Sequence, residues 1–286
     1  MEFPVEDSEY ADDTAILFPS RKSLEECLPK LITHFQRFGA EIHVGRGEGP
    51  SKSEILFVAK ARILYTEPDT FDGTDLTKVV LPDGSYMPVV ELFKYLGSIL
   101  SRDCRDDLDV EARIEAASAA FGALRQCLFS SANICLDAKK IVYIGLILSI
   151  LLYGSETWCL TEKLYNRLRC FHARCVRSMS RVNLLHTRRH RISTADLLDR
   201  MDMNEIDSYI TRRQLRWAGH VARMEFERLP RKMLSSWVAN RRPRGAPEFT
   251  YGRGLIKSLK RVELNSGNWA VRALDRECWQ AILATT

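Results

Sequence analysis

The chain has 286 residues, of which 45% are hydrophobic and 28% are charged. This composition is typical of a folded globular protein and excludes a chain that is disordered throughout. The longest uncharged run, residues 141–155, is too short to span a bilayer, so we expect a buried helix there and no membrane contact. The sequence opens without a basic, apolar leader, and its eight cysteines lack the spacing of a disulfide scaffold. We therefore expect a nuclear or cytoplasmic protein with reduced thiols, not a secreted one.

Charge is distributed unevenly along the chain. Residues 1–164 carry 17 Lys and Arg against 26 Asp and Glu, whereas residues 165–261 carry 23 against 8, and 20 of those 23 cations are arginines. Guanidinium groups fork onto phosphate oxygens, so a net charge of +15 built mainly from arginine favours a polyanionic partner. A solvated basic face without a ligand is the alternative that this pattern leaves open.

The first third of the chain predicts short strands and one helix. The predicted strands are residues 10–11, 15–18, 54–59, 79–81, 86–90 and 93–100, the last containing Gly97. Asp12 and Asp13 form an acidic turn between the first two strands. Ser20 is placed to cap a helix that reaches residue 38 and ends at Gly39. A turn at residues 82–84 predicts that the strands on either side of it form a hairpin.

From residue 106 onward the spacing of the apolar residues is helical. The predicted helices cover residues 106–128, 137–154, 161–179, a short segment capped by Ser193, 204–226 with Asn204 as its cap, and 269–283. Residues 240–254 predict an exposed basic linker. The order of elements indicates an α+β part followed by an all-α part.

The sequence Tyr10-Ala11-Asp12-Asp13 combines two adjacent carboxylates at a tight turn. Like charges at close range repel, and a hard divalent cation with oxygen ligands reverses that cost. The bare acidic pair is also common in ordinary hairpin turns. The four residues together resemble the metal-binding signature of reverse transcriptases, in the form found in non-LTR (LINE-type) retrotransposons.

Further stretches resemble the same family in the same order along the chain. They are Phe38-Gly39-Ala40-Glu41-Ile42-His43 with Lys52-Ser53-Glu54, Phe93-Lys94-Tyr95-Leu96-Gly97-Ser98, Tyr153-Gly154-Ser155-Glu156-Thr157-Trp158, Leu215-Arg216-Trp217-Ala218-Gly219-His220, and Asp275-Arg276-Glu277-Cys278-Trp279. By resemblance, the first pair is similar to a palm motif, the second stretch to the primer-grip strand, and the third to a thumb segment. The last two stretches are similar to the C-terminal region. Each match is short, and their shared order carries the resemblance.

The resemblance implies roles for individual residues. Asp12 would be the essential ligand of magnesium and Asp13 its lesser partner, and Lys52 would be the acid that protonates the pyrophosphate leaving group. Phe93, Tyr95 and Gly97 would hold the primer end. The alternatives are an exposed loop lysine at position 52 and plain β-sheet core at positions 93–97.

The resemblance also implies the domain order and a limit on activity. The expected fold is α+β, with a partial reverse-transcriptase palm over residues 1–105, an all-α thumb over 106–182, and a basic helical C-terminal region over 183–286. Two-metal nucleotidyl transfer needs carboxylates on both sides of the ions, and the family carries one essential Asp on an upstream strand. Only nine residues precede Tyr10, so we expect a truncated RNA-directed DNA polymerase that binds magnesium only if its site is completed. A non-catalytic nucleic-acid-binding or interaction protein derived from such an element is the alternative. The sequence makes no prediction of the oligomeric state.

The cysteines and histidines at positions 170, 175, 186 and 190 have spacings that could suit zinc. Helical geometry opposes this, because positions five apart lie roughly 140° apart around a helix. We therefore expect no zinc site, with Cys175 in the core and His186 and His190 in a loop.

The helix over residues 204–226 predicts two faces. Apolar residues, among them Trp217, cluster on one side, and Arg212, Arg216 and Arg223 cluster roughly 130° away. This predicts an arginine face that docks on a nucleic-acid backbone, either an RNA template or a DNA duplex. The further residues predicted to bind nucleic acid are Arg188, Arg189, Arg241, Arg242 and Arg244. A solvated helix face is the alternative.

Overall fold

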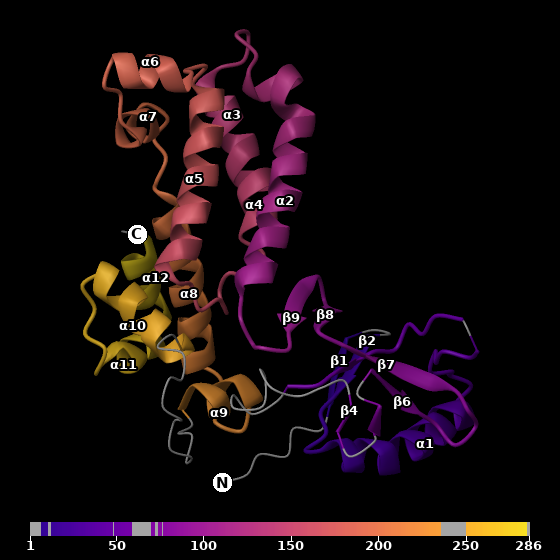
Figure 1. Cartoon of the computed structure of the whole chain (residues 1–286). Helices are drawn as coiled ribbons and strands as arrows, with labels where there is room; N and C mark the ends of the chain where they lie inside the picture. Colours follow the sequence, from indigo (N-terminus) through magenta and orange to yellow (C-terminus); the bar gives the residue numbers. More distant parts are fainter. Residues whose placement is uncertain are drawn as a thin grey trace. The chain divides into compact units, whose positions relative to one another are not determined.

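The computed structural model describes residues 7–10, 13–47, 49–58, 70–71, 74–75, 77–235 and 250–284. The chain divides into two compact units, Met1–Arg105 and Asp106–Thr286, and each is described by itself. The strands, with one helix, belong to the first unit, and the second unit is built from helices (Figure 1).

The first unit contains short strands in hairpins and one small mixed sheet. Its elements are β1 (Asp7–Tyr10), β2 (Asp13–Ile16), α1 (Arg21–Arg37), β3 (Ile55–Leu56), β4 (Thr70–Phe71), β5 (Thr74–Asp75), β6 (Lys78–Val80), β7 (Tyr86–Val90), β8 (Leu92–Tyr95) and β9 (Ser98–Ser101). The pairs β1–β2, β4–β5 and β8–β9 are antiparallel, and the sheet has the order β3-β7-β6, with β3 parallel to β7.

Helix α1 confirms the helix predicted after Ser20. The Ser20 side chain accepts a hydrogen bond from the Ser23 backbone N–H (3.2 Å), which satisfies one of the free donors of the first turn. Gly39 follows the helix with φ +76°, a conformation that glycine adopts without steric cost. Leu28 of α1 is buried in a small core with Leu81 and Met87.

The prediction of one strand over residues 93–100 was wrong, because these residues form the β8–β9 hairpin. Tyr95 pairs with Ser98, and the two residues between them, Leu96 and Gly97, have φ of 48° and 84°. Positive φ at both central positions makes a two-residue turn whose twist matches antiparallel strands. The strand predicted over residues 54–59 is also shorter than expected, since only β3 is formed among its described residues.

The second unit is a set of helices. They are α2 (Asp107–Leu124), the π-helical turn η1 (Arg125–Phe129), α3 (Leu136–Val142), the π-helical turn η2 (Tyr143–Ile147), α4 (Leu148–Leu151), α5 (Glu162–Met179), α6 (Leu184–Arg189), α7 (Thr194–Arg200), α8 (Ile206–Ala222), α9 (Leu229–Ser235), α10 (Tyr251–Arg261), α11 (Trp269–Leu274) and α12 (Arg276–Ala284). No helix in the described part of the chain is both long and apolar enough to cross a membrane.

The larger core of this unit lies between α2, the α3–α4 segment and α5, which run side by side (Figure 1). Thr161 caps α5, and the apolar stripe predicted for this helix is buried from Leu164 to Met179. The stacked rings of Phe121 and Phe129 (centroids 4.3 Å apart) fill the space beside α5. The buried cluster continues as far as Ile210, so the domain boundary predicted between residues 182 and 183 falls inside one core.

A second core joins α8 to α10, α11 and α12. The Trp279 indole N–H donates a hydrogen bond to the Leu215 carbonyl oxygen (3.0 Å), and its ring lies against the α8 backbone at Gly219. A Cβ atom at position 219 would lie 2.1 Å from the Trp279 indole nitrogen. Only glycine fits here, so a close helix–helix approach explains this residue.

Three sequence predictions about the last hundred residues need correction. Helix α8 begins at Ile206 and not after Asn204, whose carbonyl oxygen instead contacts the His172 ring. The helix predicted over residues 269–283 is two helices, because Asp275 is extended and its side chain accepts N–H bonds at the start of α12. Of the predicted linker, residues 240–249 lie outside the described residues, and residues 251–254 belong to α10, which Thr250 caps.

Candidate functional site

The acidic hairpin is formed by β1 and β2. The two strands pair so that Tyr10 faces Asp13, with two residues between them. The two strands predicted here are present with other bounds than the expected 10–11 and 15–18, and Asp13 starts the second strand instead of lying in a turn. The two residues between the strands, Ala11 and Asp12, lie outside the described residues. Both side chains are exposed, Tyr10 to 67%. Asp12, the predicted essential ligand, lies outside the described residues.

The described residues do not by themselves form a complete magnesium site. Within the described ranges, no group of three or more His, Cys, Asp or Glu side chains could hold a metal ion. Asp13 contributes one carboxylate at the hairpin, and two-metal catalysis needs carboxylates from opposing sides. Lys52 is exposed in the loop between α1 and β3, where its backbone N–H donates to His43 Nδ1 (3.1 Å). No catalytic step follows from these residues alone.

The residues predicted to hold the primer end are brought together by the β8–β9 hairpin. Phe93 and Tyr95 lie on the same side of β8, half-buried, with their rings stacked at a centroid distance of 6.1 Å. Gly97 lies in the turn and not within a strand. The hairpin therefore presents two aromatic rings on one face and a tight turn at its end.

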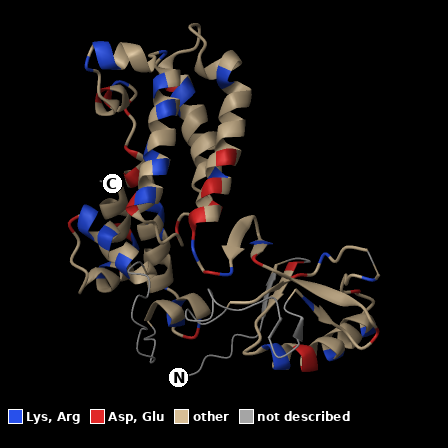
Figure 2. Cartoon of the chain, viewed as in Figure 1, with Lys and Arg blue, Asp and Glu red and all other residues tan. Residues whose placement is uncertain are grey.

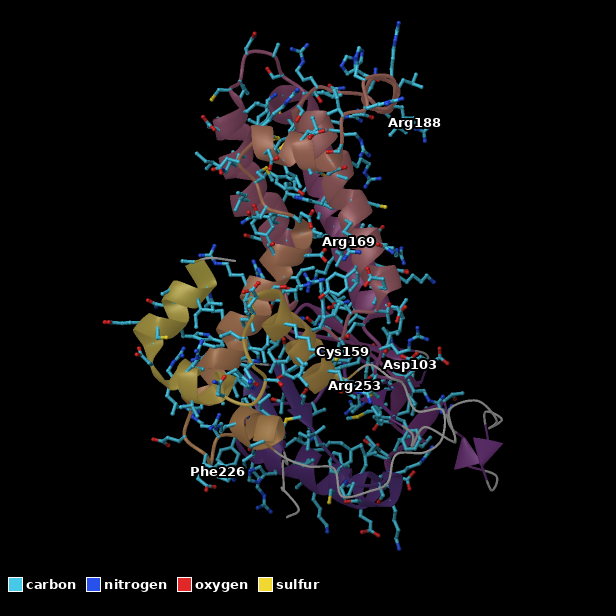
Figure 3. All side chains as sticks on the ribbon, turned by 90° about the vertical axis from the view of Figure 1, so that its left-hand side faces the viewer. Asp103, Cys159, Arg169, Arg188, Phe226 and Arg253 are labelled. Carbon is cyan, nitrogen blue, oxygen red and sulfur yellow. The ribbon has the colours of Figure 1, made fainter. Side chains whose placement is uncertain are left out.

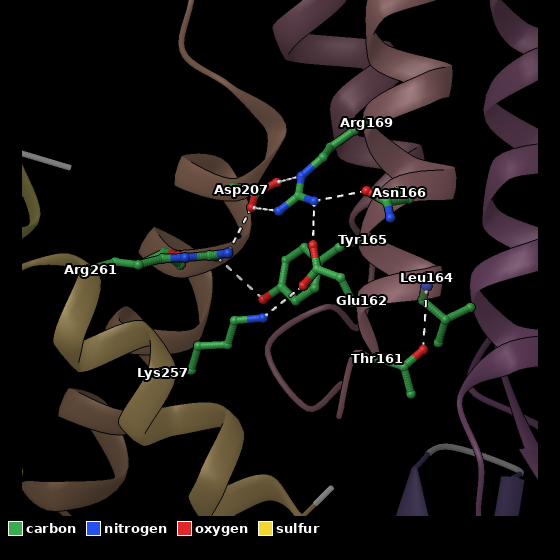
Figure 4. Close-up of polar contacts among 10 residues, drawn as sticks. Thr161, Glu162, Leu164, Tyr165, Asn166, Arg169, Asp207, Lys257 and Arg261 are labelled. Carbon is green, nitrogen blue, oxygen red and sulfur yellow. Dashed lines mark hydrogen bonds and ion pairs between the residues drawn. The ribbon is translucent and has the colours of Figure 1, made fainter.

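Several basic residues of the helical unit stabilise the fold through a network around Asp207 (Figure 4). Asp207, on α8, accepts hydrogen bonds from Arg169 Nε (2.9 Å) and Nη2 (2.6 Å) on α5, and from Arg261 Nη2 (2.7 Å) on α10. Glu162 accepts from Arg169 Nη1 (2.5 Å) and from Lys257 Nζ (3.1 Å). The network joins three helices that are separated by tens of residues in the sequence.

The Tyr165 ring lies at the centre of this network. The cationic groups of Lys257, Arg261 and Arg169 lie 4.7, 4.9 and 5.4 Å from the ring centroid. Burial raises the pKa of the Tyr165 hydroxyl, which keeps it neutral among these cations. Hydrogen bonds from Arg169 and then Lys257 hold the pKa of the Glu162 carboxyl below its ordinary value. These cations are therefore paired with carboxylates within the helical unit, and they stabilise the fold instead of facing a ligand.

The sequence analysis missed this network. A signal was present, because Asp207 lies between the buried positions Ile206 and Ile210 of an amphipathic helix. An acid on the apolar side of a helix needs a partner. Its partners lie 38 and 54 residues away, and their identity could not be read from local spacing.

Helix α8 carries two exposed arginines rather than the predicted three. Arg212 and Arg216 are exposed one turn apart. Arg223 is half-buried, and its Nη1 donates a 2.6 Å hydrogen bond to the carbonyl oxygen of Ala273 on α11. The prediction of a three-arginine face was wrong, because the C-terminal helices pack against the end of α8. Trp217, expected in the core, is half-buried.

The remaining predicted arginines divide into two sets. Arg188 and Arg189 are exposed at the end of α6, and Figure 2 shows basic residues there and along the helices of this unit. Neither of them, nor Arg212 or Arg216, forms an ion pair with any residue that the structure describes. Arg241, Arg242 and Arg244 lie outside the described residues.

The cysteine–histidine spacing does not bring its four residues together. Cys175 is 1% exposed in the core, where burial raises the pKa of its thiol to about 12, and Cys170 is exposed on the same helix. The prediction that Cys175 is a core residue is confirmed. His186 and His190 lie on or beside α6, where a loop was expected, because the Asn183 side chain caps this helix by accepting the His186 N–H (2.7 Å).

One buried histidine was not singled out from the sequence. His172, 2% exposed on α5, contacts the Tyr143 hydroxyl through Nδ1 (2.8 Å) and the Asn204 carbonyl oxygen through Nε2 (3.2 Å). Both contacts are satisfied when the proton is on Nε2 and Tyr143 donates to Nδ1. Burial lowers the pKa of His172 to about 4, so the ring is neutral near pH 7. It is a structural residue of the core.

Comparisons with known proteins support a retrotransposon-derived origin. The chain is 24% identical over 282 residues to a Caenorhabditis elegans protein described as transposon-derived, a match that covers 96% of this chain and 93% of that protein. It is 26% identical over 178 residues to the Drosophila melanogaster "Probable RNA-directed DNA polymerase from transposon BS". That match covers 60% of this chain and 18% of the Drosophila protein. No family model and no solved structure matches the chain.

Proposed function

We propose that this chain is the palm-and-thumb portion of a non-LTR retrotransposon reverse transcriptase, and that it binds nucleic acid through exposed arginines of its helical unit. The order of the motifs supports the family, and so does the printed name of the Drosophila relative. One observation carries the binding function. Arginines that serve the fold are paired with carboxylates or carbonyl oxygens, whereas those at the end of α6 and on α8 are exposed without such partners among the described residues.

Clustered arginines without ion-pair partners repel one another, and this repulsion costs free energy unless a polyanion offsets it. Residues 165–261 have 23 Lys and Arg against 8 Asp and Glu. Three of these acids, Asp207, Asp202 and Glu227, already pair with basic residues of the same unit. The phosphate backbone of RNA or DNA supplies many negative charges at regular spacing, and arginine matches phosphate geometry. Nucleic acid is therefore the partner that fits this charge.

The reaction of the resembled family is RNA-templated DNA synthesis with two magnesium ions, and it depends on more than nucleic-acid binding. It requires carboxylates that face each other across the metal pair. The acids that the structure describes at this hairpin, Asp7, Glu9 and Asp13, all belong to β1 and β2 and so cannot supply the opposing side. We therefore propose that the 286-residue polypeptide binds nucleic acid without extending a primer. A non-catalytic nucleic-acid-binding protein derived from such an element has the same binding surface and also extends no primer by itself. Primer extension that appears only when an upstream fragment with the opposing carboxylate is supplied would favour the polymerase portion over this alternative.

The test is a titration of the 286-residue chain with a 20-base-pair RNA–DNA hybrid at several salt concentrations. Each phosphate contact contributes a log–log slope near −0.9 on duplex DNA, so R212A/R216A should flatten the slope by roughly two units. The double variant K22A/K30A removes two exposed cations from α1 in the first unit, and it should leave the slope unchanged. Circular dichroism must first show that all variants keep their helix content. A wild-type chain that does not bind the hybrid refutes the proposed function.

A further inference from the structure

Residues 181–191, here called the α6 tip, form a basic surface of the helical unit. In sequence they are Arg-Val-Asn-Leu-Leu-His-Thr-Arg-Arg-His-Arg, with four arginines, two histidines and no Lys, Asp or Glu. All four arginines and both histidines are exposed. None of the four arginines forms an ion pair with a carboxylate in the described ranges, in contrast to Arg169 and Arg261.

The α6 tip is a fixed structure. Thr187 is buried and its hydroxyl donates to the Leu184 carbonyl oxygen (2.8 Å), while Val182 and Ile192 pack against the large core. The tip lies across the C-terminal end of α5 (Figure 1), and Figure 3 shows Arg188 there, among side chains that extend away from the ribbon. The backbone that carries the basic side chains is thus held by the core before a ligand arrives, which reduces the backbone entropy lost on binding.

Two exposed leucines belong to the same α6 tip. Leu184 is 50% exposed and Leu185 is 76% exposed, on the first turn of α6. Contacts with phosphates alone need no apolar side chains. Apolar side chains beside arginines match a nucleic acid whose base faces are accessible, because leucine can enter an unstacked step and guanidinium can stack on a base.

We propose that the α6 tip recognises a duplex interrupted by unpaired bases, with Leu184 and Leu185 against the unstacked bases and the arginines on the flanking phosphates. This rests on the proposed nucleic-acid binding and names the shape of the partner. The four arginines without a counter-charge make a polyanion the complementary occupant. An anionic membrane surface would also suit leucines beside arginines, and it is an outcome of the test.

The experiment compares two probes by fluorescence anisotropy with the full 286-residue chain. One is a fully paired 20-base-pair hybrid, and the other carries a central two-nucleotide bulge. The wild-type chain should bind the bulged probe about tenfold more tightly, because stacking on exposed bases adds to the phosphate contacts. L184S/L185S should remove this preference and keep the salt slope. R188A/R189A should flatten the slope on both probes by roughly two units.

Arg191 is left unchanged because its φ of 53° disfavours most replacements. The matched control L274S replaces a leucine that is 58% exposed on α11, and it should keep the preference for the bulge. A bulge preference that persists in L184S/L185S would overturn the inference. So would binding to phosphatidylserine vesicles that depends on these leucines while the two probes bind equally. If the wild-type chain binds neither probe, the proposed function itself fails. If it binds both equally, only the tip inference fails.

Discussion

Replacing Asp207 tests whether the charged network, in addition to apolar packing, holds α10 against α5 and α8. Its side chain is 12% exposed and holds two guanidinium groups with hydrogen bonds of 2.6 to 2.9 Å. Asp207→Asn keeps the volume and one acceptor oxygen, and removes the negative charge. Arg169 then keeps Glu162 as a partner. Among the described residues, Arg261 keeps the hydroxyls of Tyr165 and Thr211 and the face of the Tyr165 ring, but no carboxylate.

The size of the effect follows from how far the partners are exposed. Removing one member of a fully buried pair costs roughly 3–5 kcal/mol, because the other charge remains without a partner. The side chains of Arg169 and Arg261 are 38% and 26% exposed, so water recovers part of that loss. We expect Asp207→Asn to lower the free energy of unfolding by about 2–3 kcal/mol, measured by urea denaturation at pH 7.

Asp202→Asn is the matched control. Asp202 forms an ion pair with Lys140 at 2.6 Å, but its side chain is 97% exposed, so its loss should change the free energy of unfolding far less than the loss of Asp207 does. Arg261→Ala completes a double-mutant cycle with Asp207→Asn, and a network predicts that the two changes are not additive. Equal effects of Asp207→Asn and Asp202→Asn, or additive effects in the cycle, would refute the reasoning.

Three further outcomes are expected. Gly219→Ala should lower the free energy of unfolding by about 1–3 kcal/mol, because the added methyl group clashes with Trp279. Gly122→Ala, at an open helical site, should raise the free energy of unfolding by roughly 0.5–1 kcal/mol. Urea denaturation that finds the same sign for both variants would contradict this. Burial lowers the pKa of His172 to about 4, below the roughly 6.5 of an unfolded histidine, so the unfolded state takes up the proton first. The stability that the neutral His172 ring contributes is complete above about pH 6.5 and is lost as the pH falls toward 4. His172→Gln should therefore reduce the difference in the free energy of unfolding between pH 7.5 and pH 5, measured by denaturation at both pH values. An unchanged difference would exclude His172 as the source of the pH dependence. Finally, the 286-residue chain should not extend a primer on an RNA template with magnesium or manganese, and an extension product that disappears in Asp12→Ala would show that the chain is competent alone.

Local signals predicted some helices of the second unit, among them α5 and α7. Helix α5 has its cap at Thr161 and its apolar residues at helical spacing, and the box at Ser193–Asp196 forms as expected, with both reciprocal hydrogen bonds. In each case the residues that determine the element lie within one or two turns of each other. The hairpin at Leu96 and Gly97 was missed, although a glycine at the second position of a two-residue turn is a local signal.

Contacts between distant residues could not be predicted in this way. The position of Arg223 on a helical wheel matches that of Arg216, yet Arg223 contacts Ala273, which is 50 residues away. Helical spacing tells which residues share a face, and it does not tell what later elements cover. The arginines of the basic half therefore separated into structural and exposed ones only when their partners were known.

The same distinction applies to the stretches that carry the family resemblance. Two of them, around Gly219 and around Trp279, meet in one packing contact, where the absence of a side chain on α8 accommodates the indole ring. The fold of the helical unit explains these two matches, so they give no information about catalysis. Asp13 differs, because it is exposed on its hairpin and no packing contact with the described residues requires a carboxylate there. A chain of this kind can keep its helical unit, with the arginines that the unit displays, whether or not its acidic hairpin belongs to a complete metal site. The proposed nucleic-acid binding and the polymerase activity of the resembled family are therefore separate questions for this polypeptide, and separate assays test them.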